Sequence, residues 1–470
     1  MKLLGAIVAL SLILCVIFSA YTLYQIYYWK KVGTYTADLG DISAFSSSYS
    51  FFPGDPVPLL AHTTKDAEAR LYRLGATLED MNRTVAVPKT LQNAAYSVQE
   101  GVDWTPVADV DTTGLQPGLY AVEIKQVDSE AKPFWLSFVL KSRSPKPITV
   151  IASTYTWESY NDFGGISRYV NTRINSAAEK FLKFAYERLG IRTPSAVMAT
   201  KRPNVAVSED LAKGHNPMEP AFSKMVRGEW ALIAFLEREG YDYAVYTDHD
   251  MVASPEPLNA SIVVLNGHCE YWTQEMIYAF ENYIHRGGRA FVTAGNPIFR
   301  PVEIRGNSLR FAMEDLPRSY ISSLIGAFYT NEGQGSSAPF RVRAADHWVF
   351  KNTGLTNGAT FGERSLSLPL PQPPSNGDPY PDGASGGYTS KIGEGSGAFV
   401  RLADGLNAEG AANMVYRDTE AGGWVFNTAS LLFTGALLID PVVAQITRNV
   451  LEEGISKAEG KRFVHAQPMD

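Results

Sequence analysis

The sequence predicts an α/β protein in three parts: an N-terminal transmembrane helix, a β-sandwich domain and a mostly parallel α/β sheet domain. An uncharged apolar run opens the chain, short strand-like segments without helical periodicity follow it, and buried-type strands then alternate with amphipathic helices. The predicted boundaries are 1–32 for the helix, 33–147 for the sandwich, 148–456 for the α/β domain and 457–470 for a polar tail.

The apolar run lies between Lys2 and Lys30, with no charged residue between them. A membrane span needs about 20 apolar residues, and tyrosines together with Trp29 crowd the far end, as in an interfacial aromatic belt. A cleaved signal peptide is the alternative, but bulky Phe18 does not suit a cleavage site. We therefore expect a single-pass membrane anchor. Lysines at both ends leave its orientation open, and the short flank before a large domain favours the extracytoplasmic (periplasmic) side for the soluble domains.

The segment from Gly33 to Ser144 contains several short runs of β-branched and aromatic residues, bounded by proline, glycine and aspartate; examples are "PVPLLAHT", "GLYAVEIKQV" and "PFWLSFVLK". Several short strands of this kind indicate a β-sandwich. The proline-rich stretch from Ser144 to Pro147 is the predicted linker.

Strands and helices alternate after this linker. The predicted strands are "ITVIAST", "YDYAVYTD", "ASIVVLNG" and "RAFVTAG", and the predicted helices are "NTRINSAAEKFLKFAYERLG", "SKMVRGEWALIAFLEREG" and "TQEMIYAFENYIHRGG". This alternation predicts crossover units and a mostly parallel sheet. Unbroken apolar runs fit parallel strands, because such strands are buried on both faces. Beyond Pro297 the pattern becomes less regular.

Charge and cysteine content exclude two classes of protein. The formal net charge is -7, without a clustered basic face, so we expect no nucleic-acid partner. Only Cys269 lies in the soluble part, so no disulfide framework can form.

Residues that carry chemistry follow each of the predicted parallel strands. Ligands of open α/β sheets bind beyond the carboxyl ends of the strands. In chain order, these ends are followed by Tyr160, by the run Asp248–Asp250, by the run His268–Glu270, and by Asn296. We expect these residues, although far apart in the sequence, to meet along one edge of the sheet.

The sequence alone leaves the role of His268 and Glu270 open. An imidazole near a carboxylate can form a metal-ligand pair or an acid/base pair. It can equally be part of a hydrogen-bonded turn, with Gly267 at an unusual backbone angle and Thr273 capping the next helix. For Cys269 we expect a buried small apolar side chain rather than a nucleophile.

The histidine-containing runs elsewhere are less specific. The run Asp248–Asp250 has a metal-like composition, but adjacent side chains of an extended segment point to opposite faces. We expect a solvated loop there.

Five segments, in order, resemble the C-terminal domain of the large subunit of N,N-dimethylformamidase; they are "TWESYNDFGGISRY", "FLEREGYDYAVYTDHD", "VVLNGHCEYWTQEM", "YIHRGGRAFVTAGNPIF" and "HWVFKNTGLTNGATFG". The segments "PGDPV", "YRLG" and "GLYAVEI" resemble the domain that precedes it in this family. The resemblance implies a fold related to class I glutamine amidotransferases. It also implies hydrolysis of a small amide at one iron ion, held by two tyrosines and a glutamate beside a histidine.

Carried over by position, the resemblance makes Tyr160 and Glu270 metal ligands and His268 the catalytic histidine. Asn204, in "TKRPNVAV", stands where the family has its second tyrosine, and an amide is a weaker ligand for ferric iron than a phenolate. Tyr169 and Tyr186 are candidates to replace that tyrosine. Glu363 is a candidate for a later acid of the family. The N-terminal helix is not part of the family's soluble pattern.

Two functions are therefore expected from the sequence. The first is a membrane-anchored, metal-assisted hydrolase of a C–N (amide) bond in a small molecule, with one iron ion as its cofactor. The second is a non-catalytic binding or structural protein of a membrane complex, built on the same scaffold with a degenerate metal site. A small amide is the partner in the first case, and other membrane proteins are the partners in the second.

Overall fold

The computed structural model describes the following residues: 2–174, 176–188, 196–219, 223–333, 335–366, 382–408 and 410–456. The predicted polar tail, 457–470, lies outside them, as does the side chain of Tyr186.

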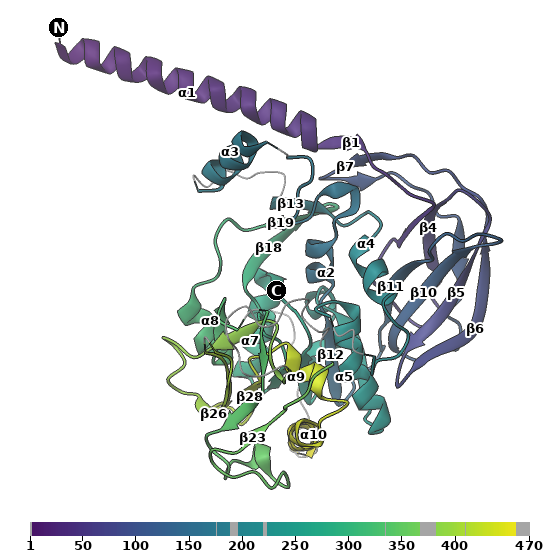
Figure 1. Ribbon diagram of the computed structural model, residues 1–470, viewed down its shortest axis with the longest axis vertical. Coiled ribbons are helices and arrows are strands. Elements are labelled where there is room, and N and C mark those ends of the chain that lie inside the picture. The colour runs from purple at the N-terminus through teal and green to yellow at the C-terminus, as the bar shows by residue number, and fades with distance from the viewer. Residues whose placement is uncertain are drawn as a thin grey trace, which may run out of the picture.

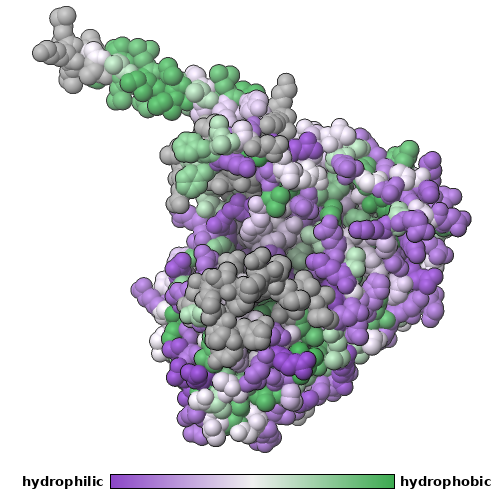
Figure 2. All heavy atoms as spheres, viewed as in Figure 1, coloured by the Kyte–Doolittle hydropathy of each residue, from purple (hydrophilic) through white to green (hydrophobic). Residues whose placement is uncertain are grey.

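Helix α1 (Lys2–Val32) projects from the body of the protein as a single rod (Figure 1). Its segment Ile7–Tyr24 is apolar and long enough to cross a membrane, and it is exposed except at Tyr21 and Tyr24, which are partly buried. The middle of this helix is largely green, hence hydrophobic, in Figure 2, in contrast to the mixed surface of the body. The structure thus confirms one apolar N-terminal helix, which has the properties of an anchor or of a signal sequence.

Two facing sheets follow α1. One has the order β2-β4-β9 and the other β3-β11-β10-β5-β6. Their bounds are β2 (Ile42–Ser46), β3 (Ser50–Phe51), β4 (Val57–Thr63), β5 (Ala67–Leu74), β6 (Leu78–Val87), β9 (Ala108–Val110), β10 (Gly118–Gln126) and β11 (Phe134–Leu140). Alternate side chains, such as Leu59 of β4 and Leu71 of β5, point into one shared apolar core. This is the arrangement of a β-sandwich.

A second, nine-stranded sheet has the order β14-β12-β15-β17-β28-β27-β26-β22-β23. Its bounds are β12 (Ile148–Ala152), β14 (Tyr243–Thr247), β15 (Ile262–Leu265), β17 (Arg289–Val292), β22 (Phe340–Val342), β23 (Thr360–Phe361), β26 (Val400–Gly405), β27 (Ala411–Asp418) and β28 (Trp424–Asn427). The first five strands in this order are parallel, and each later strand is antiparallel to its neighbour.

The mixed α/β class is confirmed. The prediction of a mostly parallel sheet is wrong for the part of the sheet formed by β27, β26, β22 and β23, which is antiparallel. The less regular segment after Pro297 supplies the antiparallel strands. β26 and β27 are joined by a short connection, and such a connection cannot cross over the sheet as a parallel pair requires. The likeness to glutamine amidotransferases stays a prediction.

Helices cover both faces of the nine-stranded sheet. Ile148 and Val150 of β12 pack in one apolar core with α5 (Val226–Arg238) and α10 (Pro441–Ser456), whereas Ile151 packs in the other with α7 (Gln274–His285). Strand side chains alternate between faces, so both faces of β12 are buried. This burial explains the unbroken apolar run in its sequence.

Smaller elements complete the described chain. A four-stranded sheet has the order β13-β19-β18-β16, with bounds β13 (Val197–Ala199), β16 (Tyr271–Thr273), β18 (Arg300–Arg305) and β19 (Ser308–Phe311). The short sheets contain β1 (Thr34–Thr36), β7 (Ala95–Ser97), β8 (Gly101–Val102), β20 (Phe328–Thr330), β21 (Ser337–Ala338), β24 (Ser385–Gly386) and β25 (Thr389–Lys391). The other helices are α2 (Thr154–Tyr160), α3 (Ala177–Arg188), α4 (Val205–Leu211), α6 (Asp250–Ala253), α8 (Arg318–Ile325) and α9 (Leu432–Ala436).

The strand order of the large sheet reverses direction at β12. The chain runs from β12 to β14 on one side and then places β15 on the other side of β12. In open α/β sheets the crevice beyond the carboxyl ends of the strands at such a reversal is the usual ligand site. The ends of β12 and β15 are therefore where a site is expected.

Candidate functional site

Tyr160 and the run His268–Glu270 leave the two strands that flank this reversal. After β12 the chain enters α2, whose last residue is Tyr160. After β15 it turns through Gly267, passes the buried residues His268 and Glu270, and enters β16. The sheet thus brings together side chains that lie more than a hundred residues apart.

The turn at Gly267 has the unusual backbone angle expected from the sequence, with φ at +68°. A side-chain carbon at this position would lie 2.9 Å from Cγ of Glu229, so the turn has no room for one. Thr273 caps α7, because its hydroxyl accepts a hydrogen bond from the Met276 backbone N–H at 3.3 Å. Both features fix the path of the chain on either side of His268 and Glu270.

Glu229, which the sequence analysis did not single out, lies between the start of α2 and the turn at Gly267. Its Oε1 accepts hydrogen bonds from Trp157 Nε1 at 2.9 Å and from the Ser153 backbone N–H at 3.2 Å. Burial raises the pKa of Glu229 well above its ordinary value. Burial therefore disfavours the charged form of the carboxyl group beneath the turn.

Four side chains form a row of hydrogen bonds that we call the tyrosine–glutamate cluster: Tyr160, His268, Glu270 and Tyr169. The Tyr160 hydroxyl lies 3.2 Å from Nε2 of His268, and that nitrogen lies 3.2 Å from Oε2 of Glu270. The Tyr169 hydroxyl donates to the same Oε2 at 2.8 Å. The two tyrosine rings are stacked, with their centroids 4.4 Å apart. Tyr160 and Glu270 therefore face one point, as the resemblance requires.

Glu270 is held firmly in this position. Its Oε1 accepts a hydrogen bond from Nδ2 of Asn296 at 2.5 Å, and its backbone N–H donates to Oγ1 of Thr156 at 3.0 Å. Burial opposes ionisation, but His268, the Tyr169 hydroxyl and the Lys224 ammonium together hold the pKa of Glu270 below its ordinary value. The cluster therefore contains an anionic carboxylate.

The pKa values of the two cluster tyrosines are shifted upward, whereas that of Glu270 is shifted downward. Burial, followed by the nearby charge of Glu270, raises the pKa of both Tyr160 and Tyr169 far above the ordinary value for a phenol. Without another cation the phenols remain protonated and act as hydrogen-bond donors.

Two further residues border the cluster and were missed by sequence reasoning. The Tyr388 hydroxyl lies 3.4 Å from that of Tyr160, and its ring centroid is 4.2 Å from that of His268. The Lys224 ammonium donates to the Tyr388 hydroxyl at 3.1 Å and lies 3.6 Å from the ring centroid of Tyr160. Tyr388 comes from a loop and Lys224 precedes α5, so no strand-end pattern marked either one.

The donor set fits a metal ion that prefers oxygen ligands. Among the described residues, no three His, Cys, Asp or Glu side chains are close enough to hold a metal, so an ion here needs the phenols as ligands. Phenolate and carboxylate oxygens, the forms these side chains take when bound to a metal, suit ferric iron. In addition, Nδ1 of His268 and Oδ1 of Asn296 are buried and have no hydrogen-bond partner in the described structure, as expected where a polar ligand is missing.

Asn204 does not belong to this cluster. Its amide donates to the Tyr49 hydroxyl at 2.9 Å, and its Oδ1 accepts from the Val207 backbone N–H at 3.0 Å, which caps α4. Tyr169, one of the two tyrosines named as replacements, reaches Glu270; the side chain of the other, Tyr186, lies outside the described residues. The later acid candidate, Glu363, is exposed.

The remaining candidates, Cys269, Asp248 and Asp250, are buried among side chains of the fold. Cys269 is fully buried, as expected, and burial raises the pKa of its thiol, which disfavours the reactive thiolate. The prediction of a solvated loop for Asp248–Asp250 is wrong for both carboxylates. Asp248 accepts hydrogen bonds from Thr154 and Tyr155 at the start of α2, and Asp250 pairs with Lys141 at 2.7 Å.

Comparison with known proteins identifies the family of this chain. A family model described as "N,N-dimethylformamidase beta subunit-like, C-terminal" matches residues 68–316 and 306–445. The N,N-dimethylformamidase beta subunit of an Alcaligenes species is 29% identical over 211 residues, which cover 41% of this chain and 27% of that protein. The chain thus matches about a quarter of the length of this relative.

Two solved structures illustrate a remote likeness. A ThuA-like protein from Parabacteroides merdae matches 51% of this chain and 87% of its own, with 14% identity and a TM-score of 0.26. A cycloisomaltooligosaccharide glucanotransferase from a Paenibacillus species matches 24% of this chain and 16% of its own, with 15% identity and a TM-score of 0.16.

Proposed function

This chain belongs to the family of the N,N-dimethylformamidase beta subunit-like C-terminal domain, and from that premise we propose that it hydrolyses the C–N bond of a small amide at the tyrosine–glutamate cluster. One observation carries the proposal: Tyr160, His268, Glu270 and Tyr169 converge, in hydrogen-bonding contact, beyond the two strands at which the sheet order reverses.

In this proposal Tyr160, Tyr169 and Glu270 would hold one iron ion, with His268 beside it. Such an ion would polarise the amide carbonyl and lower the pKa of a bound water. Glu270 supplies the negative charge that attracts a cation, and Asn296 keeps its carboxylate oriented.

The chain's own groups would handle the protons. The imidazole of His268 lies beside a phenol and a carboxylate of the proposed ligand set, and in its neutral form it would accept a proton from the attacking water and then give it to the departing amine. The C–N bond breaks as the new C–O bond forms, which leaves a carboxylic acid and an amine. The Lys224 ammonium contributes positive charge where the carbonyl oxygen becomes negative.

The test compares the full chain, purified in detergent, with Glu270→Gln. We expect about one iron per wild-type chain by elemental analysis, and release of dimethylamine from N,N-dimethylformamide. Glu270→Gln should lose both, because a neutral amide neither attracts the cation nor completes the ligand set. Glu130→Gln, an exposed position in the sandwich, is the matched control and should retain both.

The same measurement separates the two functions expected from the sequence. A folded wild-type chain that binds no metal and releases no amine would contradict the hydrolase. It would favour the non-catalytic component of a membrane complex.

We also propose that α1 stays attached and anchors the chain in a membrane, with the folded domains on the extracytoplasmic side. The support is the exposed apolar surface of Ile7–Tyr24, which water would solvate poorly.

A further inference from the structure

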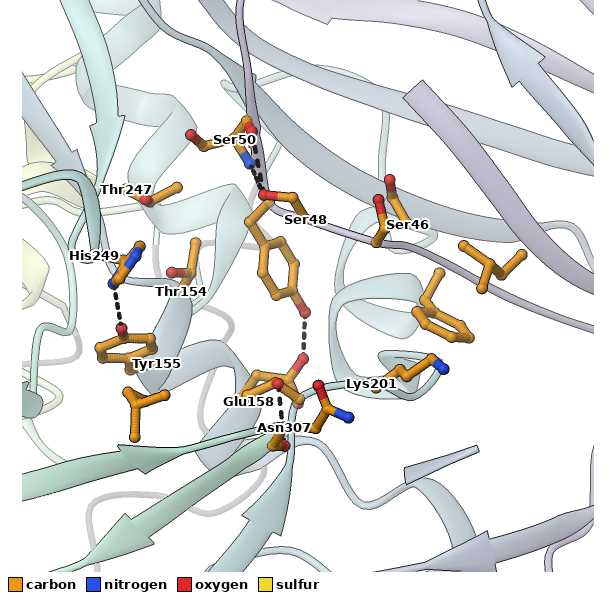
Figure 3. Close-up of a pocket in the computed structure, with 16 residues that line it drawn as sticks. Ser46, Ser48, Ser50, Thr154, Tyr155, Glu158, Lys201, Thr247, His249 and Asn307 are labelled. Carbon is orange, nitrogen blue, oxygen red and sulfur yellow. Dashed lines mark hydrogen bonds between the residues drawn. The ribbon is translucent and has the colours of Figure 1, made fainter. Parts of the chain in front are cut away.

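A cavity of about 440 Å³ with polar and apolar walls lies between the β-sandwich and the α/β domain (Figure 3). Its walls come from the segment Ser46–Ser50, from α2, and from the segments that follow β13, β14 and β18. In the close-up, Ser46, Ser48 and Ser50 lie on one side of the cavity, and Glu158, Lys201 and Asn307 lie on the other. The volume falls within the range of about 300–1,000 Å³ that is usual for small-molecule sites.

This cavity is distinct from the tyrosine–glutamate cluster. None of the four cluster residues is among the described residues that line it. Thr154 and Glu158 of α2 line the cavity, whereas Tyr160, at the end of the same helix, contacts His268. A ligand here would therefore occupy a second site.

Most hydroxyl protons in the cavity wall are already used. The Tyr49 hydroxyl donates to Glu158 at 2.5 Å, Ser50 donates to Asp250 at 3.0 Å, and Thr154 donates to Asp248 at 2.6 Å. A hydroxyl has only one proton to donate, so these oxygens can offer a ligand only their lone pairs. The wall is therefore rich in neutral acceptors.

Two donors complement these acceptors. Oγ of Ser46 is buried and has no hydrogen-bond partner in the described structure. The Lys201 ammonium lies at the cavity, and its ion pair with the exposed Asp103 is long, at 3.8 Å. Three apolar side chains, from Phe45, Leu60 and Ile304, supply a non-polar part of the wall.

The charges near the cavity disfavour a cationic ligand. Glu158 is paired with Arg202 at 3.4 Å, and both side chains are fully buried. Asp250 is likewise paired with Lys141, at 2.7 Å. These pairs bring no net charge to the wall, and Lys201 would repel a cation.

We infer that this cavity binds a neutral monosaccharide, because a sugar has many hydroxyl donors for the wall's acceptors, hydroxyl oxygens for Ser46 and Lys201, and a C–H face for the apolar side chains. The inference does not depend on the proposed amide hydrolysis.

Saturation-transfer NMR tests it with the full chain in lauryldimethylamine oxide, a detergent without a sugar headgroup. The probes are D-glucose, D-galactose and D-mannose, each at millimolar concentration. At least one should receive saturation from the wild type. Lys201→Met and Ser46→Val should weaken its binding at least tenfold, because each removes a donor. Lys213→Met, an exposed lysine outside the cavity, should bind like the wild type.

Several results would overturn the inference. They are the absence of transfer to all three sugars, equal binding by the wild type and Lys201→Met, and displacement of the sugar by millimolar sodium sulfate, which would indicate an anion site at Lys201. A thermal unfolding curve of each variant shows that it is folded. If Ser46→Val does not fold, Lys201→Met alone decides, because that side chain is partly exposed.

Discussion

At the scale of single residues, we expect substitution of Tyr169 to affect the metal site and substitution of Asn204 to leave it unchanged. Tyr169 donates to Glu270 at 2.8 Å, so Tyr169→Phe removes a ligand or a ligand's partner. We expect metal affinity or kcat/KM for N,N-dimethylformamide to fall about 10–100-fold. Iron content and dimethylamine release measure this effect. Tyr278→Phe, an exposed tyrosine of α7, is the control.

Asn204→Ala should leave iron content unchanged, because Asn204 contacts Tyr49 and α4 rather than the cluster. It should instead lower the free energy of unfolding by about 1 kcal/mol or more, through loss of the helix cap. Urea unfolding followed by tryptophan fluorescence measures this change. A fall in iron content without a loss of stability would mean that Asn204 acts at the metal.

Gly267 permits a third comparison. Gly267→Ala should cost about 1–2 kcal/mol for the left-handed backbone, and more because the new carbon would lie 2.9 Å from Glu229. Gly240→Ala is the matched control, since Gly240 also has positive φ but no atom within 4 Å of the added carbon. Equal losses of unfolding free energy in the two variants would contradict the close contact.

The residues of the cluster were only partly predictable from the sequence. Tyr160, His268 and Glu270 follow buried apolar strands, and the rule that parallel strands end at one edge is enough to place them together. Tyr169 and Tyr388 lie in irregular segments. Their positions depend on packing between distant parts of the chain, which periodicity does not encode.

At the scale of elements, strands with a clear burial pattern were predictable from the sequence and strands without one were not. β12, β14, β15 and β17 were predictable because burial on both faces leaves unbroken apolar runs. β26 was not, because its sequence "VRLADG" mixes exposed and buried residues. Because such mixed patterns do not mark a strand clearly, the sequence analysis missed the antiparallel part of the sheet and predicted a mostly parallel one.

We expect helix α1 to determine whether the chain is found in the membrane fraction. Deletion of residues 2–32 should release the chain from the membrane fraction, because the exposed apolar segment Ile7–Tyr24 is lost. Alkaline carbonate extraction of cell membranes, followed by detection of the chain in pellet and supernatant, measures the change. Mass spectrometry of the wild type provides the control, since a chain that begins after α1 would show a cleaved signal sequence and contradict the anchor.

At the scale of the whole molecule, several buried carboxyl groups affect the pH dependence of stability. Burial raises the pKa of Asp248 to about 7, and it also raises the pKa of Glu229 and Asp210. In the unfolded chain these groups ionise near their ordinary values, so the folded state binds more protons between pH 4 and 7. Their contribution to stability is therefore complete below about pH 4 and is lost as the pH rises.

We expect the free energy of unfolding to be lower at pH 8 than at pH 5, with Asp248 responsible for a difference on the order of a few kcal/mol. Asp248→Asn should reduce this difference, since an amide does not titrate, although it also loses one acceptor for the hydrogen bonds from Thr154 and Tyr155. Urea unfolding of both chains at the two pH values is the measurement. A wild type that becomes more stable from pH 5 to pH 8 would show that Asp248 ionises readily in the fold, and hence that water reaches the start of α2.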